Sequence, residues 1–186
     1  MSVSNVLVIA ATNSTTSINR RLAVHAAEIL RDELAASVMI DVLDLNDYDM
    51  PVFSPERQAQ GIPPAAQKFY DRIGASDGLI MSFAEYNGSY TAAFKNVFDW
   101  ASRIDMKIYQ NKPLLAMATS VGGRGGQNVL RTVVEAAPFF GANLTGQFNF
   151  GPFAEHFDTE TGQLKTPDLA RELRLALTAF QAAISK

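Results

Sequence analysis

The sequence contains no cysteine among its 186 residues. This absence excludes disulfides, thiolate metal sites, cysteine nucleophiles and thiol-based redox chemistry. Any redox function therefore requires a bound cofactor. Long hydrophobic runs are also missing, since none approaches the roughly 20 residues that cross a bilayer. The first residues lack the charged region and apolar stretch of a signal peptide. We expect a soluble, cytoplasmic protein with no membrane partner.

The chain also lacks a strong excess of positive or of negative charge. The chain has 16 basic and 19 acidic residues, for a net charge of -3. This balance provides no field for capturing a nucleic-acid backbone, and it is mild for an electron carrier that docks through a charged face. The two histidines, His25 and His156, have no second ligand at metal-binding spacing. We assign them structural or surface positions and expect no metal site.

The composition predicts one folded unit. Hydrophobic residues make up 47% of the chain, which is enough to bury one sizeable core. The length of 186 residues is too short for two full domains. We therefore treat residues 1–186 as a single domain. No internal repeat or linker interrupts it.

Three continuous apolar runs predict strands that are buried on both faces of a sheet. They are residues 5–11, 78–83 and 114–119. Two further segments, residues 39–45 and 143–148, carry more polar side chains and predict the edge strands.

Helical spacing of apolar residues fills the intervals between these runs. The first helix begins after Ser17, a suitable N-cap, and extends to about Leu34. Residues 46–64 are rich in proline and polar side chains and predict a long surface loop. The other expected helices cover residues 64–75, a stripe from 94 to 104 opened by Asn87-Gly88, residues 126–140 ended by Gly141, and residues 167–184.

Strands alternating with helices predict an α/β fold with a doubly wound parallel sheet of five strands and helices on both faces. The polar second and fifth strands favour the order 2-1-3-4-5. In that order the chain reverses direction between the first and third strands, where ligands bind at the carboxyl ends. The loops after Ala11, Phe83 and Thr119 should therefore converge.

The first of these loops, residues 12–19, is rich in serine, threonine and asparagine. It joins a buried strand to a helix start, where free N–H groups and the helix dipole favour an anion. The loop therefore predicts a phosphate site, although its residues could instead serve only as caps and turn formers. The GK[ST] sequence of triphosphate-binding loops is absent.

The second loop resembles a known family. Ala84-Glu-Tyr-Asn-Gly-Ser89 and Lys95-Asn-Val-Phe-Asp-Trp100 are similar to the Pro-Glu-Tyr-Asn-Gly-Ser and Lys-Asn-Ala-Ile-Asp-Trp signatures of NADPH-dependent FMN reductases. Members of that family include chromate, quinone and azo-dye reductases. Residues 12–19 resemble the family's phosphate loop through Thr12, Ser17 and Asn19, and residues 119–126 resemble its glycine-rich loop beside the flavin.

The resemblance implies a flavodoxin-like fold, bound FMN, and NADPH or NADH as co-substrate. It implies a reductase that passes hydride from the nicotinamide to FMN and then to a quinone, flavin, metal oxyanion or azo acceptor. It also implies a homodimer or a dimer of dimers. The chemistry belongs to the cofactors, so no catalytic acid or base is expected. The residues expected to bind the cofactor are Thr12, Ser14, Ser17, Ile18, Asn19, Ala84, Glu85, Tyr86, Asn87, Gly88, Ser120, Gly122 and Gly123.

These residue types suit a flavin ring, which is a flat apolar plate with a polar edge. Tyr86 can offer a flat face, Asn87 can bond the ring's rim, and Gly88 permits close approach of the backbone. In the third loop, Ser120 and the glycines would let amides reach the opposite edge. Arg124 would meet the nicotinamide nucleotide or a neighbouring subunit.

The chain departs from the family pattern at two positions. Ser14 stands where the phosphate loop usually has arginine, which removes one charge-assisted contact. Ala84 replaces the usual proline before Glu85 and loosens the turn. Two alternatives follow: a noncatalytic FMN-binding electron-transfer module, and a phosphate-ligand sensor that has lost flavin.

Overall fold

The computed structural model describes residues 3–34 and 37–185. Its main sheet has five parallel strands in the order β2-β1-β3-β4-β5, as the sequence predicts. The strands are β1 (Ser4–Ala10), β2 (Val38–Leu43), β3 (Gly78–Phe83), β4 (Pro113–Thr119) and β5 (Asn143–Phe150).

Burial follows the predicted division into central and edge strands. Every residue of β3 is buried, and β4 is buried beyond its first residue. Only one residue of β2 is buried, and in β5 only Phe148 and Phe150 are buried. Polar side chains on the edge strands therefore reach water, whereas β3 and β4 consist almost entirely of buried apolar residues.

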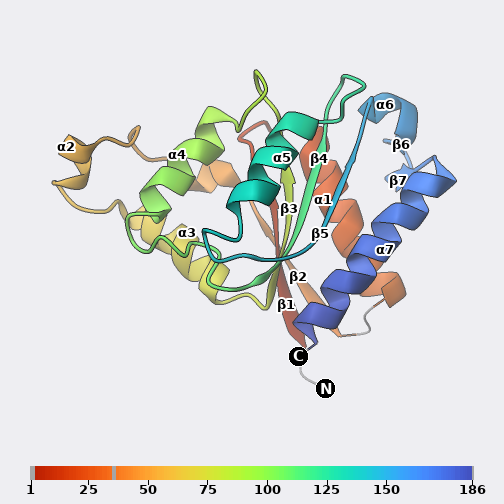
Figure 1. Ribbon diagram of the computed structural model, residues 1–186, viewed down its shortest axis with the longest axis horizontal. Coiled ribbons are helices and arrows are strands. Elements are labelled where there is room, and N and C mark those ends of the chain that lie inside the picture. Colours follow the sequence, from red (N-terminus) through yellow and green to blue (C-terminus); the bar gives the residue numbers. More distant parts are fainter. Residues whose placement is uncertain (1–2, 35–36, 186) are drawn as a thin grey trace.

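Helices cover both faces of the sheet (Figure 1). One face carries α3 (Pro64–Gly74), α4 (Ala92–Ala101) and α5 (Gln127–Ala136), whose apolar sides pack into one core cluster. The other carries α1 (Ile18–Ile29) and α7 (Pro167–Ile184), which pack into the second cluster. The loops that follow β1, β3 and β4 gather at the end of the sheet opposite the start of β1 and the end of α7.

Helix α4 contributes to the core. Phe94 and Trp100 are each 1% exposed, and the Trp100 indole donates a hydrogen bond to the Pro51 carbonyl at 2.7 Å. The helix begins at Ala92, where the Thr91 hydroxyl accepts from the Phe94 N–H, so the predicted start at Asn87-Gly88 is wrong. Ile104 lies beyond its end.

Other boundaries also differ from the predictions. Helix α5 ends at Ala136, before the predicted residue 140, because Pro138 lacks the N–H that a continuing helix needs. The predicted loop 46–64 contains most of a 3-10 turn, η2 (Leu45–Tyr48), and a short helix, α2 (Pro55–Gln58). Helix α1 continues as a π-helical turn, η1 (Leu30–Leu34).

A small structured segment after β5 was not predicted. It comprises α6 (Phe153–His156) and an antiparallel hairpin of β6 (Phe157–Asp158) and β7 (Gln163–Leu164). Asp158 organises the turn, because its carboxylate accepts from the Glu160 N–H at 2.8 Å. Strands of two residues carry too little periodicity to be found in a sequence.

Candidate functional site

The loops after β1, β3 and β4 meet in one pocket of about 220 Å³. This convergence confirms the expectation drawn from the strand order. The predicted site residues that line the pocket are Thr12, Ser14, Ser17, Ile18, Asn19, Ala84, Glu85, Tyr86 and Ser120.

Three further lining residues were missed: Thr16, Thr119 and Val121. Each adjoins a predicted one in sequence, so extending every loop by a residue would have found them. Four predicted residues lie in the same loops without lining this pocket, namely Asn87, Gly88, Gly122 and Gly123.

The first loop leads into α1 and presents backbone donors. The Ser17 hydroxyl caps the helix by accepting from the Arg20 N–H at 3.2 Å. Within the described residues, the N–H groups of Thr16, Ile18 and Asn19 donate to no acceptor. Free N–H groups at a helix N-terminus, with hydroxyls beside them, form a setting for a phosphate that needs no cation.

Asn19 joins the first loop to the end of β4. Its Nδ2 donates to the Thr119 carbonyl, and its Oδ1 accepts from the Thr119 N–H, both at 3.0 Å. The Ser82 hydroxyl donates to the same Oδ1 at 2.7 Å. All three residues are buried. The Asn19 side chain therefore lines the pocket, and its polar atoms fix the position of the loop after β1 relative to the ends of β3 and β4.

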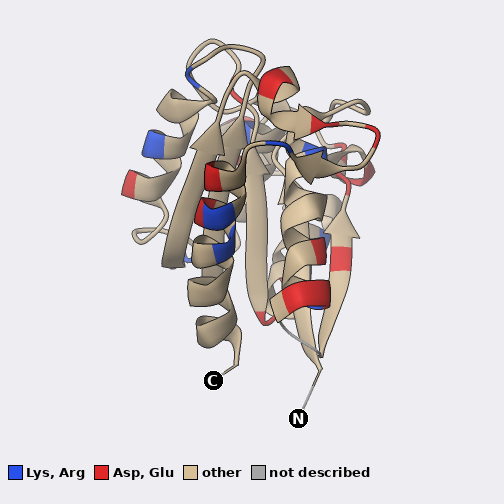
Figure 2. Ribbon diagram, turned by 90° about the vertical axis from the view of Figure 1, so that its right-hand side faces the viewer, with Lys and Arg blue, Asp and Glu red and all other residues tan. Residues whose placement is uncertain are grey.

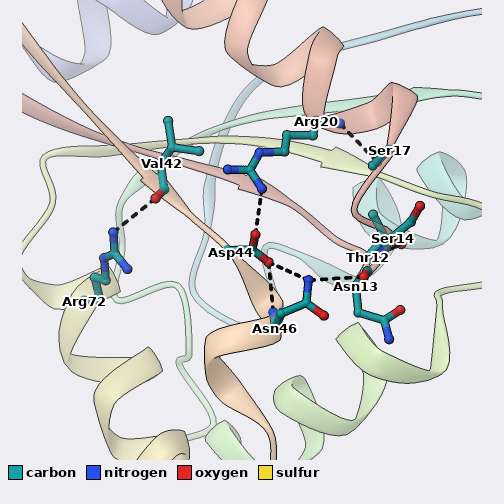
Figure 3. Close-up of polar contacts among 9 residues, drawn as sticks. All are labelled: Thr12, Asn13, Ser14, Ser17, Arg20, Val42, Asp44, Asn46 and Arg72. Carbon is teal, nitrogen blue, oxygen red and sulfur yellow. Dashed lines mark hydrogen bonds and ion pairs between the residues drawn. The ribbon is translucent and has the colours of Figure 1, made fainter.

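A second set of contacts holds the first loop against β2 (Figure 3). Arg20 donates to Asp44 at 2.7 Å, and Asp44 accepts from both the backbone and side-chain N–H groups of Asn46. Asn46 in turn donates to the Asn13 carbonyl at 3.2 Å. These hydrogen bonds, led by that of the Asn46 backbone, lower the pKa of the Asp44 carboxyl.

The second loop is a tight turn. Tyr86 and Ser89 exchange backbone hydrogen bonds at 3.0 and 3.1 Å, and the two residues between them have positive φ, 53° at Asn87 and 79° at Gly88. Asn-Gly is the sequence that such a turn prefers. The turn holds the Tyr86 ring at the pocket, where the side chain is 52% exposed.

Glu85 connects the second loop to α5. Its Oε2 accepts from the Val129 N–H at 2.9 Å, and its Oε1 accepts from the Asn128 side chain at 3.4 Å. The carboxylate thus caps the first turn of α5, where the helix dipole favours negative charge. The predicted contact of Glu85 with a cofactor remains a prediction, and its charge already has this structural use.

The glycines of the third loop divide into two pairs. Gly125 and Gly126 have positive φ, and a Cβ at Gly125 would clash with the Phe150 backbone. These two are required by the fold. A Cβ at Gly122 would meet only the Ser120 hydroxyl at 4.0 Å, and one at Gly123 would meet nothing within 4 Å. Among the described residues, no contact demands glycine at these two positions, and their predicted role in cofactor binding stays a prediction.

The remaining candidates lie elsewhere. His25 is in α1, and the Nδ1 of His156 hydrogen-bonds the Thr166 hydroxyl at 2.8 Å. Arg124 and Gly123 line a separate cavity bounded by β5 and the start of α7. The predicted role of Arg124 stays a prediction.

The sequence model of the NADPH-dependent FMN reductase family matches residues 4–155. The chain belongs to this family. It is 34% identical over 86 residues to an NAD(P)H-dependent FMN reductase of Pseudomonas aeruginosa, a match covering 46% of this chain and 45% of that protein. It is 26% identical over 172 residues to a quinone reductase of Escherichia coli, covering 91% and 89% of the two chains.

Solved structures share the fold. A flavoenzyme NAD(P)H:(acceptor) oxidoreductase of Paracoccus denitrificans superposes with a TM-score of 0.75 at 22% identity, covering 98% of both chains. An NADH:FMN oxidoreductase without its ligand gives a TM-score of 0.68 at 17% identity, covering 96% of this chain and 89% of that one. With the family match, the flavodoxin-like fold and a flavin-dependent NAD(P)H oxidoreductase are established. FMN is its cofactor and NAD(P)H its co-substrate.

No helix among the described residues is long and apolar enough to cross a membrane.

Proposed function

We propose that the three-loop pocket holds FMN, with the phosphate at residues 12–19 and the ring between the second and third loops. The deciding observation is the first loop, where free N–H groups of Thr16, Ile18 and Asn19 stand at the start of α1 beside the hydroxyls of Thr12 and Ser17. A phosphate monoester satisfies these donors. The open positions at Gly122 and Gly123 and the exposed face of Tyr86 support the placement of the ring.

The chain's contribution to the reaction is positioning. Bound FMN would supply the redox chemistry, hydride transfer from the nicotinamide and electron transfer to a second substrate. The Asn19 contacts fix the first loop relative to β3 and β4, and Glu85 fixes the second loop relative to α5. Tyr86 supplies an apolar surface beside the ring, and backbone amides of the second and third loops supply hydrogen bonds to its edges. No side chain of the pocket is needed as an acid or base.

The pocket is open, which suits two substrates that bind in turn. We propose that NAD(P)H binds first, that the oxidised nucleotide leaves, and that a quinone, flavin, metal oxyanion or azo compound then takes its place. The similarity to the Escherichia coli quinone reductase, which extends over 89% of that protein, supports a quinone as the first acceptor to test.

The experiment begins with a visible spectrum of the protein after FMN is added and free FMN is removed. NADPH or NADH is then added without oxygen. Retained FMN that bleaches and regains its colour with a quinone supports the proposal. A protein that binds FMN without oxidising either nucleotide is an electron-transfer module, and one that stays colourless is a phosphate-ligand sensor. Either result contradicts the proposed function.

The homodimer or dimer of dimers also stays a proposal. Helix α4 does not offer Phe94 and Trp100 to a partner, because both side chains are in the core. The exposed apolar residues near the site are instead Tyr86 and Val121, at 52% and 85% exposure. Light scattering of the FMN-loaded protein measures the assembly directly.

A further inference from the structure

A groove of about 410 Å³ runs along α1, next to the three-loop pocket that we propose for FMN, which is called the flavin pocket below. One wall is a stripe of the helix containing Arg21, Val24, His25 and Glu28, and the other includes Phe157 and Gly162 of the β6–β7 hairpin. The volume is in the range of small-molecule sites. Thr16 and Ser17 line both this groove and the flavin pocket, so the two are contiguous.

The buried part of the groove contains an unpartnered polar side chain. His25 is 9% exposed, and neither ring nitrogen forms a hydrogen bond with a described residue. Among the described residues, the one fully buried side-chain nitrogen or oxygen without a hydrogen-bond partner belongs to Asn5. The unpaired nitrogens of His25 are therefore not fully buried and can be reached from the groove. Phe157 packs edge-to-face on the imidazole with centroids 5.5 Å apart and fixes its orientation. Burial, then the nearby Arg174, lowers the pKa of His25, and Glu33 opposes them. A neutral imidazole offers one donor and one acceptor.

The charges of the groove are polarised along the helix. At the end beside the flavin pocket stand Arg20, which is paired with Asp44, and Arg21, which forms no ion pair with the described residues. At the other end stands Glu28. A neighbouring cavity begins there and is lined by Asp32 and Glu33, which form ion pairs with Arg31 and Arg174. Figure 2 shows acidic residues on the lower part of this face and others at its upper end, among the loops. The first end, with Arg21, therefore favours an anionic group. The second end, with Glu28, favours a hydrogen-bond donor.

An adenylate matches this arrangement. Glu28 lies seven positions after Arg21, or about 10 Å along the helix axis, which suits a phosphate at one end and a base at the other. The exocyclic amine of adenine can donate to the Glu28 carboxylate, and a ring nitrogen can pair with His25. Thr15 and Thr16 add hydroxyls near the phosphate end.

We propose that this groove binds the adenosine phosphate half of NAD(P)H. The inference rests on the proposed function of the neighbouring pocket, where the nicotinamide half reacts. A dinucleotide lying across both cavities passes its pyrophosphate near the FMN phosphate, and Arg20 and Arg21 stand at that junction to offset the repulsion.

The test uses 2′,5′-ADP as the probe, titrated calorimetrically into the protein with and without FMN. We expect binding, and we expect Arg21→Ala to weaken it about three- to tenfold through loss of the charged donor. Glu28→Gln should weaken it less and reduce discrimination against GMP, whose ring carries an oxygen in place of the amine. Both residues are exposed, so the variants should fold. The matched control is Arg171→Ala on α7, far out in solvent.

A kinetic measurement separates this groove from the flavin pocket. Arg21→Ala should raise the KM for NADPH, and it should leave kcat/KM unchanged for a dihydronicotinamide that lacks the adenylate. Absence of 2′,5′-ADP binding, or binding that neither variant alters, overturns the proposal. Binding that does not compete with NADPH overturns the assignment to the co-substrate. If NAD(P)H oxidation itself is absent, the proposed function fails, while the calorimetry still reports on the groove.

Discussion

The Ser82 hydroxyl, at the middle of the sheet, donates to the Asn19 side chain at the start of α1, across 2.7 Å. Asn19 also pairs with both backbone groups of Thr119. One amide side chain thus connects the ends of β3 and β4 to the first loop of the site. The fold and the site share this connection.

Replacing Asn19 with alanine should affect stability and FMN binding together. Asn19→Ala leaves the Ser82 hydroxyl and the Thr119 backbone groups buried without partners, which should lower the free energy of unfolding by about 2 to 4 kcal/mol. FMN affinity should fall because the loops lose their register. Urea denaturation and FMN fluorescence titration measure the two effects. Ser82→Ala is the matched milder change, since Asn19 keeps Thr119, and an unchanged urea midpoint in Asn19→Ala would contradict this account.

Two glycines of the third loop should behave oppositely. Gly125→Ala should lower the free energy of unfolding by about 2 kcal/mol or more, because alanine resists a φ of 59° and its Cβ meets the Phe150 backbone. Gly123→Ala has open space around it and should leave stability within about 0.5 kcal/mol. If the ring lies between the second and third loops as proposed, the methyl group of Gly123→Ala should instead weaken FMN binding by crowding the third loop. Equal effects of the two substitutions on thermal unfolding would show that the division is wrong.

Much of this fold could be predicted because its signals are strong. The apolar runs of β1, β3 and β4 can occupy only a doubly covered sheet, and polar positions in β2 and β5 indicate the edges. Helix ends were harder to predict. The cap at Thr91 competes with the nearby Asn87-Gly88, and only the paired Tyr86 and Ser89 show that the latter is a hairpin turn.

The site, like the fold, could be predicted only in part. Loop positions were predictable from strand order, and the resemblance supplied the residue types. The uses of individual side chains were not predictable, because they depend on partners far apart in sequence. Glu85 caps a helix that begins more than forty residues later, and Asn19 bonds Thr119 a hundred residues away. No local pattern records such contacts.

The cap formed by Glu85 should be measurable apart from the cofactor. Glu85→Ala removes the acceptor for the Val129 N–H and should lower the free energy of unfolding by about 1 kcal/mol. Glu85→Gln keeps an acceptor oxygen and should recover much of this loss, though not the interaction of the charge with the helix dipole. Hydrogen exchange at the start of α5 gives the local readout. Exchange there that is the same in all three proteins would argue against the cap.

Stability should depend on the protonation of His25. Burial lowers its pKa below the ordinary value of 6.5 in the folded protein. As the pH falls below 6.5, the unfolded chain binds a proton that the folded chain still refuses, so stability falls until the folded pKa is reached. Above pH 6.5 both states are neutral at this residue and the effect is absent. His25→Gln should flatten this part of the profile in urea denaturation. An NMR titration of the His25 ring that gives an ordinary pKa would refute the prediction without relying on the variant.

Restoring arginine in the phosphate loop should strengthen FMN binding. Ser14 lines the pocket beside Thr12 and Ser17, and Glu85, whose charge is turned to α5, is the one charged residue among the described lining residues. Ser14→Arg would add a cation opposite the phosphate dianion, and a charge-assisted hydrogen bond at this half-open position should lower the Kd for FMN about tenfold. Because the added attraction is electrostatic, the gain should shrink as salt is raised. Ser14→Ala is the control and should change the Kd little in the other direction. Riboflavin, which lacks the phosphate, should show no gain with Ser14→Arg, and an equal gain for riboflavin would place the phosphate elsewhere.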